Sequence, residues 1–273
     1  MGISPDAIGL TRRRRGPHGR QRLLGAHGAI ADGAAPSIMM VGDSWFWYPF
    51  DNLALEVGRL RPNETVVVVG NNGAEAAEWS TRYRKDIDFA FRMLASDVKV
   101  LLISGGGNDL AGMKDFLRIV KDDCSAATTV AGCYRTAEPS TLMTMLMGCY
   151  RTLITKFRAY NQRAPVILHQ YDYAWPTGQG VFGPADWLKE PMDAAQVKAE
   201  LQRKLFRDLI NRLKRAQVAL AAEPALGKIL VASSAGTLPE GTAIWANELH
   251  PTPEGFRLIA EKAIEPQLEL VPL

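Results

Sequence analysis

Five short apolar runs, each ending in glycine or polar residues, constrain the fold of this chain of 273 residues more than any other feature. The runs are Ile38–Val41, Thr65–Val69, Val98–Ile103, Val166–His169 and Lys228–Ala232. Segments with helical apolar spacing lie between them, so the order is that of parallel β–α–β units. Nearly continuous apolar strands are typical of a sheet that helices cover on both faces. The pattern therefore predicts one α/β domain with a five-stranded, mainly parallel sheet.

The predicted domain covers residues 36–273 and contains two inserted loops, at about residues 121–140 and 171–191. Helices are expected at Asn52–Leu60, Ala74–Ala95, Leu110–Val120, Leu142–Ala159, Ala194–Ala222 and Pro253–Ile264. The last one begins with proline and glutamate in its first turn, as helix N-termini often do.

Residues 1–35 differ from the rest in composition and are predicted to form a disordered, arginine-rich tail outside the domain. The first 22 residues carry six arginines and one acid, a net charge of +5, whereas the whole chain carries +3. The remainder is slightly acidic, so nucleic acid is not an expected partner. A secretory signal needs an apolar run of about 7–15 residues, which is missing here. We expect a cytoplasmic protein, or one exported without an evident signal peptide, with a twin-arginine-type signal as the weaker alternative.

The three cysteines lack the spacing of a zinc site, and no metal is expected. Cys124 and Cys133 flank a short stretch and could close a small loop in an oxidising compartment. No segment approaches the roughly 18 consecutive apolar residues of a membrane span, so no transmembrane segment is predicted. The sequence leaves the oligomeric state open.

Polar residues follow the first three predicted strands, and a histidine precedes the last predicted helix. Because the carboxyl ends of parallel strands meet at one edge of a sheet, we expect Ser44, Gly73, Asn108 and His250 to lie close together. A serine hydroxyl with an imidazole base is the arrangement of acyl transfer. The backbone N–H groups of Ser44 and Gly73 and the side-chain amide of Asn108 could form an oxyanion hole.

Four sequence blocks at these positions resemble those of the SGNH (GDSL-type) hydrolases. The blocks are Gly42-Asp43-Ser44, Asn71-Asn72-Gly73, Gly107-Asn108-Asp109 and Asn247-Glu248-Leu249-His250-Pro251. They follow the order of the family and its usual spacing. The resemblance implies a flavodoxin-like, three-layer α/β/α fold and ester hydrolysis through an acyl-serine, without metal or organic cofactor. It implies Ser44 as nucleophile, His250 as base, and Gly73 and Asn108 as oxyanion donors beside the Ser44 amide.

Asn247 departs from the family pattern, which carries aspartate three residues before the histidine. In a serine protease, such a change lowers kcat by about 10⁴. Three explanations stay open. Asn247 can turn its oxygen to His250 and act as a weaker catalytic group, or another acid, Glu248, Asp172 or Glu254, can replace it, or the chain is a poor hydrolase that keeps a binding site.

Two aromatic segments are predicted to lie at the same edge and to bind an apolar or ring-shaped part of the substrate. The candidates are Trp45, Trp47, Tyr173 and Trp175. We therefore expect a serine esterase acting on a lipid, glycan or small-molecule ester, of lipase/lysophospholipase or carbohydrate-deacetylase type. The alternative is a catalytically weak module that binds acylated ligands or a protein partner. A nucleotide binder is disfavoured because Lys-Ser/Thr does not follow the glycines at 105–107.

Overall fold

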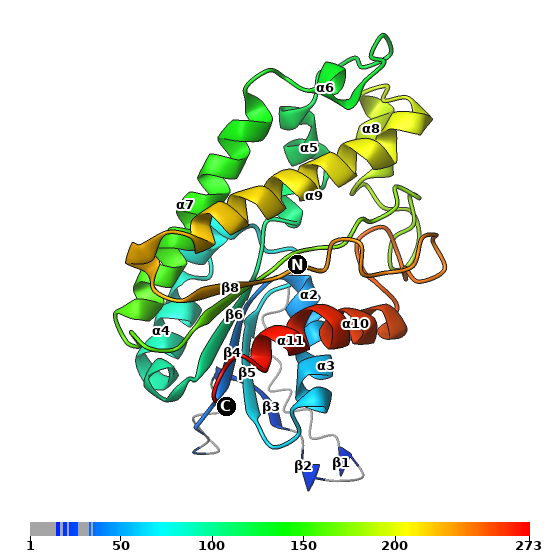
Figure 1. Ribbon diagram of the computed structural model, residues 1–273. Coiled ribbons are helices and arrows are strands. Elements are labelled where there is room, and N and C mark those ends of the chain that lie inside the picture. Colours follow the sequence, from blue (N-terminus) through cyan, green and yellow to red (C-terminus); the bar gives the residue numbers. More distant parts are fainter. Residues whose placement is uncertain (1–14, 17–18, 21, 27–32, 34) are drawn as a thin grey trace.

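The computed structural model describes residues 15–16, 19–20, 22–26, 33 and 35–273, and a parallel sheet forms its centre (Figure 1). The strand order across the sheet is β3-β5-β4-β6-β7-β8. The strands are β3 (Arg22–Gly25), β4 (Ile38–Gly42), β5 (Thr65–Gly70), β6 (Val100–Ser104), β7 (Val166–His169) and β8 (Ile229–Ala232). All five predicted strands are confirmed as β4 to β8, and each pairs with its neighbours in parallel.

Strand β3 is an addition that the sequence pattern did not predict. Its residues Arg22–Gly25 pair in parallel with Thr65–Val68, at the edge of the sheet. The structure thus differs here from the prediction that residues 1–35 stay outside the domain. Pairing at an edge needs only backbone groups, so it leaves no long apolar run to recognise. Two shorter strands, β1 (Arg15–Gly16) and β2 (Gly19–Arg20), pair with each other. Most of the other residues of the predicted tail lie outside the described residues.

Helices cover both faces of the sheet and give the expected three layers (Figure 1). One layer contains α2 (Ser44–Trp47), α3 (Leu53–Leu60), α10 (Pro253–Ile259) and α11 (Glu265–Leu268), the last two joined by a π-helical turn at Ala260–Ile264. The other contains α4 (Arg84–Leu94), α7 (Glu138–Arg158) and α9 (Ala199–Ala221). Short 3₁₀ turns lie at Ala76–Ser80, Ala95–Asp97, Asn108–Leu110 and Pro224–Leu226.

Three short helices extend the molecule beyond the sheet, at the top of Figure 1. They are α5 (Met113–Ile119), α6 (Val130–Cys133) and α8 (Lys189–Ala194). The predicted helix Ala194–Ala222 starts later in the structure, as α9 at Ala199, and its first predicted residue, Ala194, is the last residue of α8. The break lies at Gln196, whose φ of 53° is left-handed and cannot continue a helix.

The inserted segment 121–140 folds against α9 and closes with a β-bridge between Val120 and Tyr134. Cys124 and Cys133 lie buried in this segment as free thiols, and the Cys124 thiol donates to the Cys133 carbonyl at 3.6 Å. Burial raises the pKa of Cys124 to about 12. The structure therefore contains unreacted thiols where the sequence suggested a possible loop closure.

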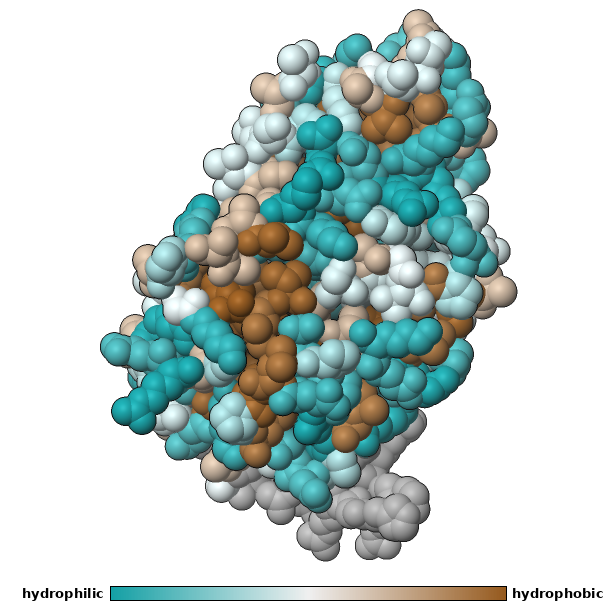
Figure 2. Space-filling view, in the orientation of Figure 1, coloured by the Kyte–Doolittle hydropathy of each residue, from teal (hydrophilic) through white to brown (hydrophobic). Residues whose placement is uncertain are grey.

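The surface over β8 and the C-terminal end of the chain carries a band of apolar side chains (Figure 2). Val218 and Leu270 are each more than half exposed, and Leu230 and Leu273 are partly buried against the core. Strand β8 is the last strand of the sheet on this side. Among the helices that the structure describes, none is long and apolar enough to cross a membrane.

The carboxyl ends of β4, β5 and β6 are aligned in register. Gly42 pairs with Gly70 on one side and with Ser104 on the other. A Cβ atom on Gly42 would lie 2.4 Å from the Ser104 carbonyl oxygen, so only glycine fits at this end of β4. The turns that carry the polar blocks of the sequence therefore leave the sheet side by side.

Candidate active site

Ser44 is the first residue of helix α2, directly beyond the end of β4. Asp43 precedes it as the N-cap and accepts a hydrogen bond from the Trp45 amide at 3.0 Å. The first N–H groups of a helix have no acceptor within the helix, so the Ser44 N–H needs a hydrogen-bond acceptor from outside it. The sharp turn between β4 and α2 presents both the hydroxyl and the amide of Ser44 at the edge of the sheet.

His250 meets Ser44 across 206 positions of sequence. Its Nε2 lies 2.7 Å from the Ser44 Oγ. The Trp45 indole donates to the Leu249 carbonyl at 3.1 Å and so ties the histidine loop to α2. The serine–histidine contact expected from the sequence is therefore present in the structure.

Asn247 lies on the far side of the imidazole, with its Oδ1 3.1 Å from His250 Nδ1. The same oxygen accepts the backbone N–H groups of Leu249 and His250, each at 2.9 Å. Only an oxygen can accept these bonds, so they determine the orientation of the amide. His250 consequently carries its proton on Nδ1, which leaves the Nε2 lone pair directed at Ser44. Of the three explanations for Asn247, the first matches this geometry.

Burial is the dominant electrostatic influence on the imidazole. His250 is 5% exposed, and burial lowers its pKa to about 3. A neutral amide supplies orientation but no charge to oppose this desolvation. The imidazole is therefore neutral over a wide pH range, and forming its cation is costly.

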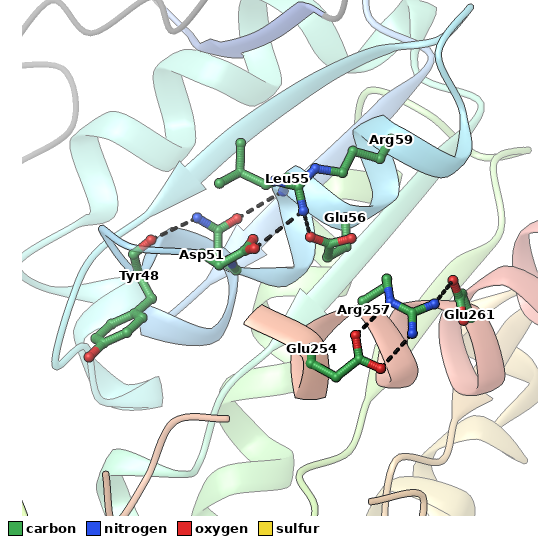
Figure 3. A network of polar contacts seen from close by, with 9 residues as sticks. Tyr48, Asp51, Leu55, Glu56, Arg59, Glu254, Arg257 and Glu261 are labelled. Atoms are coloured by element: carbon green, nitrogen blue, oxygen red, sulfur yellow. Dashed lines mark hydrogen bonds and ion pairs between the residues drawn. The ribbon is translucent and has the colours of Figure 1, made fainter. Parts of the chain in front are cut away.

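The three acids considered as replacements for aspartate are each engaged elsewhere. Glu248 accepts backbone N–H groups from Gly178, Leu188 and Lys189, at 2.7–3.0 Å. Asp172 accepts those of Tyr173, Gly236 and Leu238. Glu254 forms an ion pair with Arg257, which also pairs with Glu261 (Figure 3). Of these four residues, Asn247 is the one that forms a hydrogen bond with the imidazole.

The two further oxyanion candidates line the same pocket as Ser44 and His250. Gly73 has a φ of 74°, a left-handed conformation that favours glycine. Asn108 donates one N–H of its amide to the Ala74 carbonyl at 2.9 Å, which orients the side chain. The amide has a second N–H, so it keeps a donor for a ligand.

A cavity of about 360 Å³ opens beside Ser44 and His250. Aromatic and aliphatic side chains form most of its wall, and the described lining contains no Asp, Glu, Lys or Arg. The wall consists of Tyr48, Pro49, Phe50, Val181, Phe182, Trp187 and Leu249, with Asn72 beside Gly73. Phe50 and Phe182 are exposed at the rim and their ring centroids lie 6.3 Å apart.

The structure places the four aromatic residues proposed for substrate binding largely elsewhere. Trp45 is buried against His169 and lines only a small second pocket next to Ser44. Trp47 packs on the core. Tyr173 and Trp175 lie under the guanidinium groups of Arg207 and Arg203, at 4.4 and 3.4 Å from the ring centroids, along α9.

The aromatic residues that do surround the imidazole belong to the two predicted aromatic segments but are not among the four candidates. Tyr48 stacks on His250, with ring centroids 4.1 Å apart and an interplanar angle of 7°. Trp187 meets the same ring at 84° and 6.2 Å. Tyr48 follows Ser44 by four residues across a helical turn, a spacing that places two side chains on one face. That spacing was the available signal.

A second serine–histidine contact lies beneath the site. Ser104 Oγ is 3.0 Å from His169 Nδ1, and both residues are fully buried. The network continues to Asp43, which accepts from the Tyr171 hydroxyl. Burial raises the pKa of Asp43 to about 6 and lowers that of His169 to about 3. These buried groups support the turn that carries Ser44.

A parallel sheet covered on both faces, with a serine–histidine contact at its carboxyl edge, is the arrangement expected of an SGNH-type hydrolase. The chain belongs to the GDSL-like lipase/acylhydrolase family, whose model matches residues 30–258. Ester hydrolysis is the general activity that this family membership supports. Among the described residues, no group of three or more His, Cys, Asp or Glu side chains is placed to hold a metal ion.

Solved structures share this fold at low sequence identity. A Streptococcus pneumonia protein named for platelet activating factor has a TM-score of 0.58 and 14% identity, with 89% of this chain and 88% of that chain covered. Phospholipase A1 from Streptomyces albidoflavus has a TM-score of 0.52 and 17% identity, with 87% and 99% covered. The lipase Lip_vut3 from a goat rumen metagenome has a TM-score of 0.50 and 15% identity, with 83% and 95% covered. No curated protein matches the sequence.

Proposed function

We propose that this protein hydrolyses carboxylic esters through an acyl-serine intermediate on Ser44, with His250 as the general base. The observation that carries the proposal is the pair of contacts on the imidazole, Ser44 Oγ on Nε2 and Asn247 Oδ1 on Nδ1, at the wall of a pocket. A base must lie within hydrogen-bond reach of the proton that it removes, and 2.7 Å satisfies this.

In the first step, the Ser44 oxygen attacks the ester carbonyl carbon while its proton passes to His250 Nε2. The carbonyl oxygen becomes an oxyanion, for which the N–H groups of Ser44, Gly73 and Asn108 are the proposed donors. The C–O bond to the alcohol then breaks, and the alcohol leaves with the proton from Nε2. Water repeats the sequence on the acyl-serine and releases the acid. Asn247 holds the required tautomer throughout, through its contact with Nδ1.

The substrate class that best fits the pocket is an ester with an uncharged, largely apolar acyl group. Seven of the twelve lining residues are aromatic or aliphatic, and none of the twelve is charged. This composition favours a lipase- or lysophospholipase-like activity over deacetylation of a carbohydrate, because sugar hydroxyls need several polar partners. In open α/β folds generally, ligands bind at the carboxyl edge of the sheet. The location of the site therefore does not depend on which ester is the substrate.

Hydrolysis of p-nitrophenyl esters by the wild type and Ser44→Ala tests the proposal. We expect the variant to lose at least about 10⁴-fold in kcat, as nucleophile loss does in serine hydrolases. Butyrate and octanoate esters should be better substrates than an acetylated sugar. Equal rates for the two proteins would refute the acyl-serine mechanism.

A second candidate is a weakly catalytic module that binds acylated ligands or a protein partner, and the absence of a carboxylate on His250 Nδ1 is the observation that favours it. A fluorophosphonate probe separates the two functions. Labelling of the wild type but not of Ser44→Ala supports the hydrolase, whereas no labelling of a folded wild type supports the binding module.

A further inference from the structure

We propose that Tyr48 is a positioning residue whose ring face stabilises the protonated form of His250, in place of the carboxylate that the family carries three residues before the histidine. The inference rests on the proposed function, because it concerns the charge that His250 acquires during that reaction.

The two rings are stacked rather than merely adjacent. Their centroids lie 4.1 Å apart and their planes are within 7° of parallel. The face of an aromatic ring is the negative part of its quadrupole, so a cation placed over it is attracted. The neutral imidazole gains little from this field, but the imidazolium gains more. The contact is therefore strongest in the transition state, as effective catalysis requires.

Tyr48 also acts on the other partner of the imidazole. Its hydroxyl accepts a hydrogen bond from Asn247 Nδ2 at 3.0 Å. An amide that donates through nitrogen becomes a better acceptor at oxygen, and that oxygen faces His250 Nδ1. Tyr48, Asn247 and His250 thus close a small ring of contacts. Burial raises the pKa of Tyr48, so its ring stays neutral at physiological pH.

The backbone holds Tyr48 in this position. Its carbonyl accepts from Asn52 Nδ2 at 2.9 Å, and the oxygen of the same amide caps α3 through the Leu55 N–H at 2.9 Å (Figure 3). Tyr48 is 7% exposed. A ring fixed at both its main chain and its hydroxyl loses little entropy when the imidazole becomes charged.

The groups that face His250 are uncharged. They are Ser44 and Tyr48 from the α2 turn, Asn247 from its own loop, and Trp187 from the loop 171–191. The neighbouring carboxylates are Glu248, which the amides of 178, 188 and 189 surround, and Asp43, which bonds Trp45 and Tyr171. The Tyr48 ring is therefore the group in stacking contact with the imidazole that can favour its cation.

Graded fluorination of the ring tests this role without changing its shape appreciably. The series places phenylalanine, 4-fluoro-, 3,5-difluoro- and pentafluorophenylalanine at position 48 of the full chain. Each fluorine withdraws electron density from the face. We expect kcat for p-nitrophenyl butyrate to fall stepwise, by about 3- to 30-fold across the series, with little change in KM. A flat series overturns the proposal.

The same substitutions at Phe91 provide a matched control, because Phe91 is buried in α4 and packs on Phe157, away from the site. They should leave kcat unchanged. Tyr48→Phe compared with the wild type isolates the hydroxyl and its bond to Asn247.

A titration of the His250 ring by NMR gives a readout that needs no substrate. Fluorination at position 48 should lower the pKa of His250 progressively, and an unchanged or rising value contradicts the proposal. If Ser44→Ala keeps full hydrolysis, the proposed function fails, yet the titration still reports whether the ring face acts on the imidazole. The two failures are thus distinguishable.

Discussion

The described part of the chain contains two buried serine–histidine contacts, and their chemical settings differ. Ser44 and His250 approach to 2.7 Å at the wall of a cavity, whereas Ser104 and His169 approach to 3.0 Å in the core. In the first pair Nε2 faces the serine and Nδ1 has Asn247 as its partner. In the second pair Nδ1 faces the serine, and Nε2 has no hydrogen-bond partner among the residues that the structure describes.

Burial lowers the pKa of both imidazoles to about 3. The serine–histidine distance and the histidine pKa therefore do not distinguish the proposed catalytic pair from the buried one. The difference lies in access, in the third group that sets the tautomer, and in donors placed for an oxyanion. Only the first pair combines a cavity, an orienting amide and the neighbouring Gly73 and Asn108.

The largest expected effect comes from removing each histidine in turn. His250→Ala should lower kcat for p-nitrophenyl butyrate by about 10⁴-fold or more, because the base is lost. His169→Phe should change kcat by less than about tenfold and lower the free energy of unfolding by about 1–3 kcal/mol. Steady-state kinetics and urea unfolding measure the two effects. If a folded His169→Phe protein loses as much kcat as His250→Ala does, the proposed difference between the two pairs is wrong.

A smaller effect is expected from Asn247→Asp. Because Asn247 already holds the productive tautomer, the carboxylate should add only its charge, and kcat should rise about 10- to 100-fold at pH 8, less than the 10⁴ of the serine protease example. The carboxylate favours the imidazolium and raises the pKa of His250 from its value of about 3. The acid limb of kcat/KM should therefore move to higher pH in the variant, while the wild type stays active at lower pH. A variant slower than the wild type, with an unshifted limb, contradicts this account.

The smallest effect concerns the pH dependence of stability, in which the two pairs should behave alike. Unfolded histidine binds a proton below its ordinary pKa of about 6.5, but buried His169 stays neutral down to about 3. The contribution of His169 to the free energy of unfolding is therefore fully present above pH 6.5 and is lost as the pH falls. Replacing His169 should remove about 1.4 kcal/mol per pH unit from that slope between roughly pH 5.5 and 4. Asp43, whose pKa is raised to about 6, acts in the opposite sense, because its contribution to the free energy of unfolding decreases as the pH rises from about 4 to 6. Subtracting the His169→Phe unfolding curve from that of the wild type isolates the histidine, and equal slopes would contradict its neutral state.

The sequence was sufficient to predict strands β4 to β8 and the proximity of residues that lie far apart in the chain. Apolar runs such as Thr65–Val69 identify buried strands directly, and the parallel order brings residue 44 to residue 250. The family blocks added the expectation that a serine and a histidine make contact. These features depend on local pattern and topology, which a sequence displays.

The surroundings of the imidazole could not be predicted in the same way. The orientation of Asn247 depends on two backbone N–H groups, and the stacking of Tyr48 depends on the angle at which α2 leaves the sheet. Sequence analysis assigned substrate contact to Tyr173 and Trp175, but arginines of α9 cover those rings. Strand β3 was not predicted, because pairing at the edge of a sheet involves backbone groups and leaves no apolar run in the sequence.

Glu248 has a consequence for how the cavity can change. Its carboxylate joins the segment next to His250 to the amides of residues 178, 188 and 189, which flank Val181, Phe182 and Trp187. The segment that carries His250 and one wall of the cavity are therefore joined through the same carboxylate. Under the proposed esterase function, a substitution that reshapes this wall for a bulkier ester should also shift the imidazole, so we expect substrate range and turnover to change together on this side of the protein.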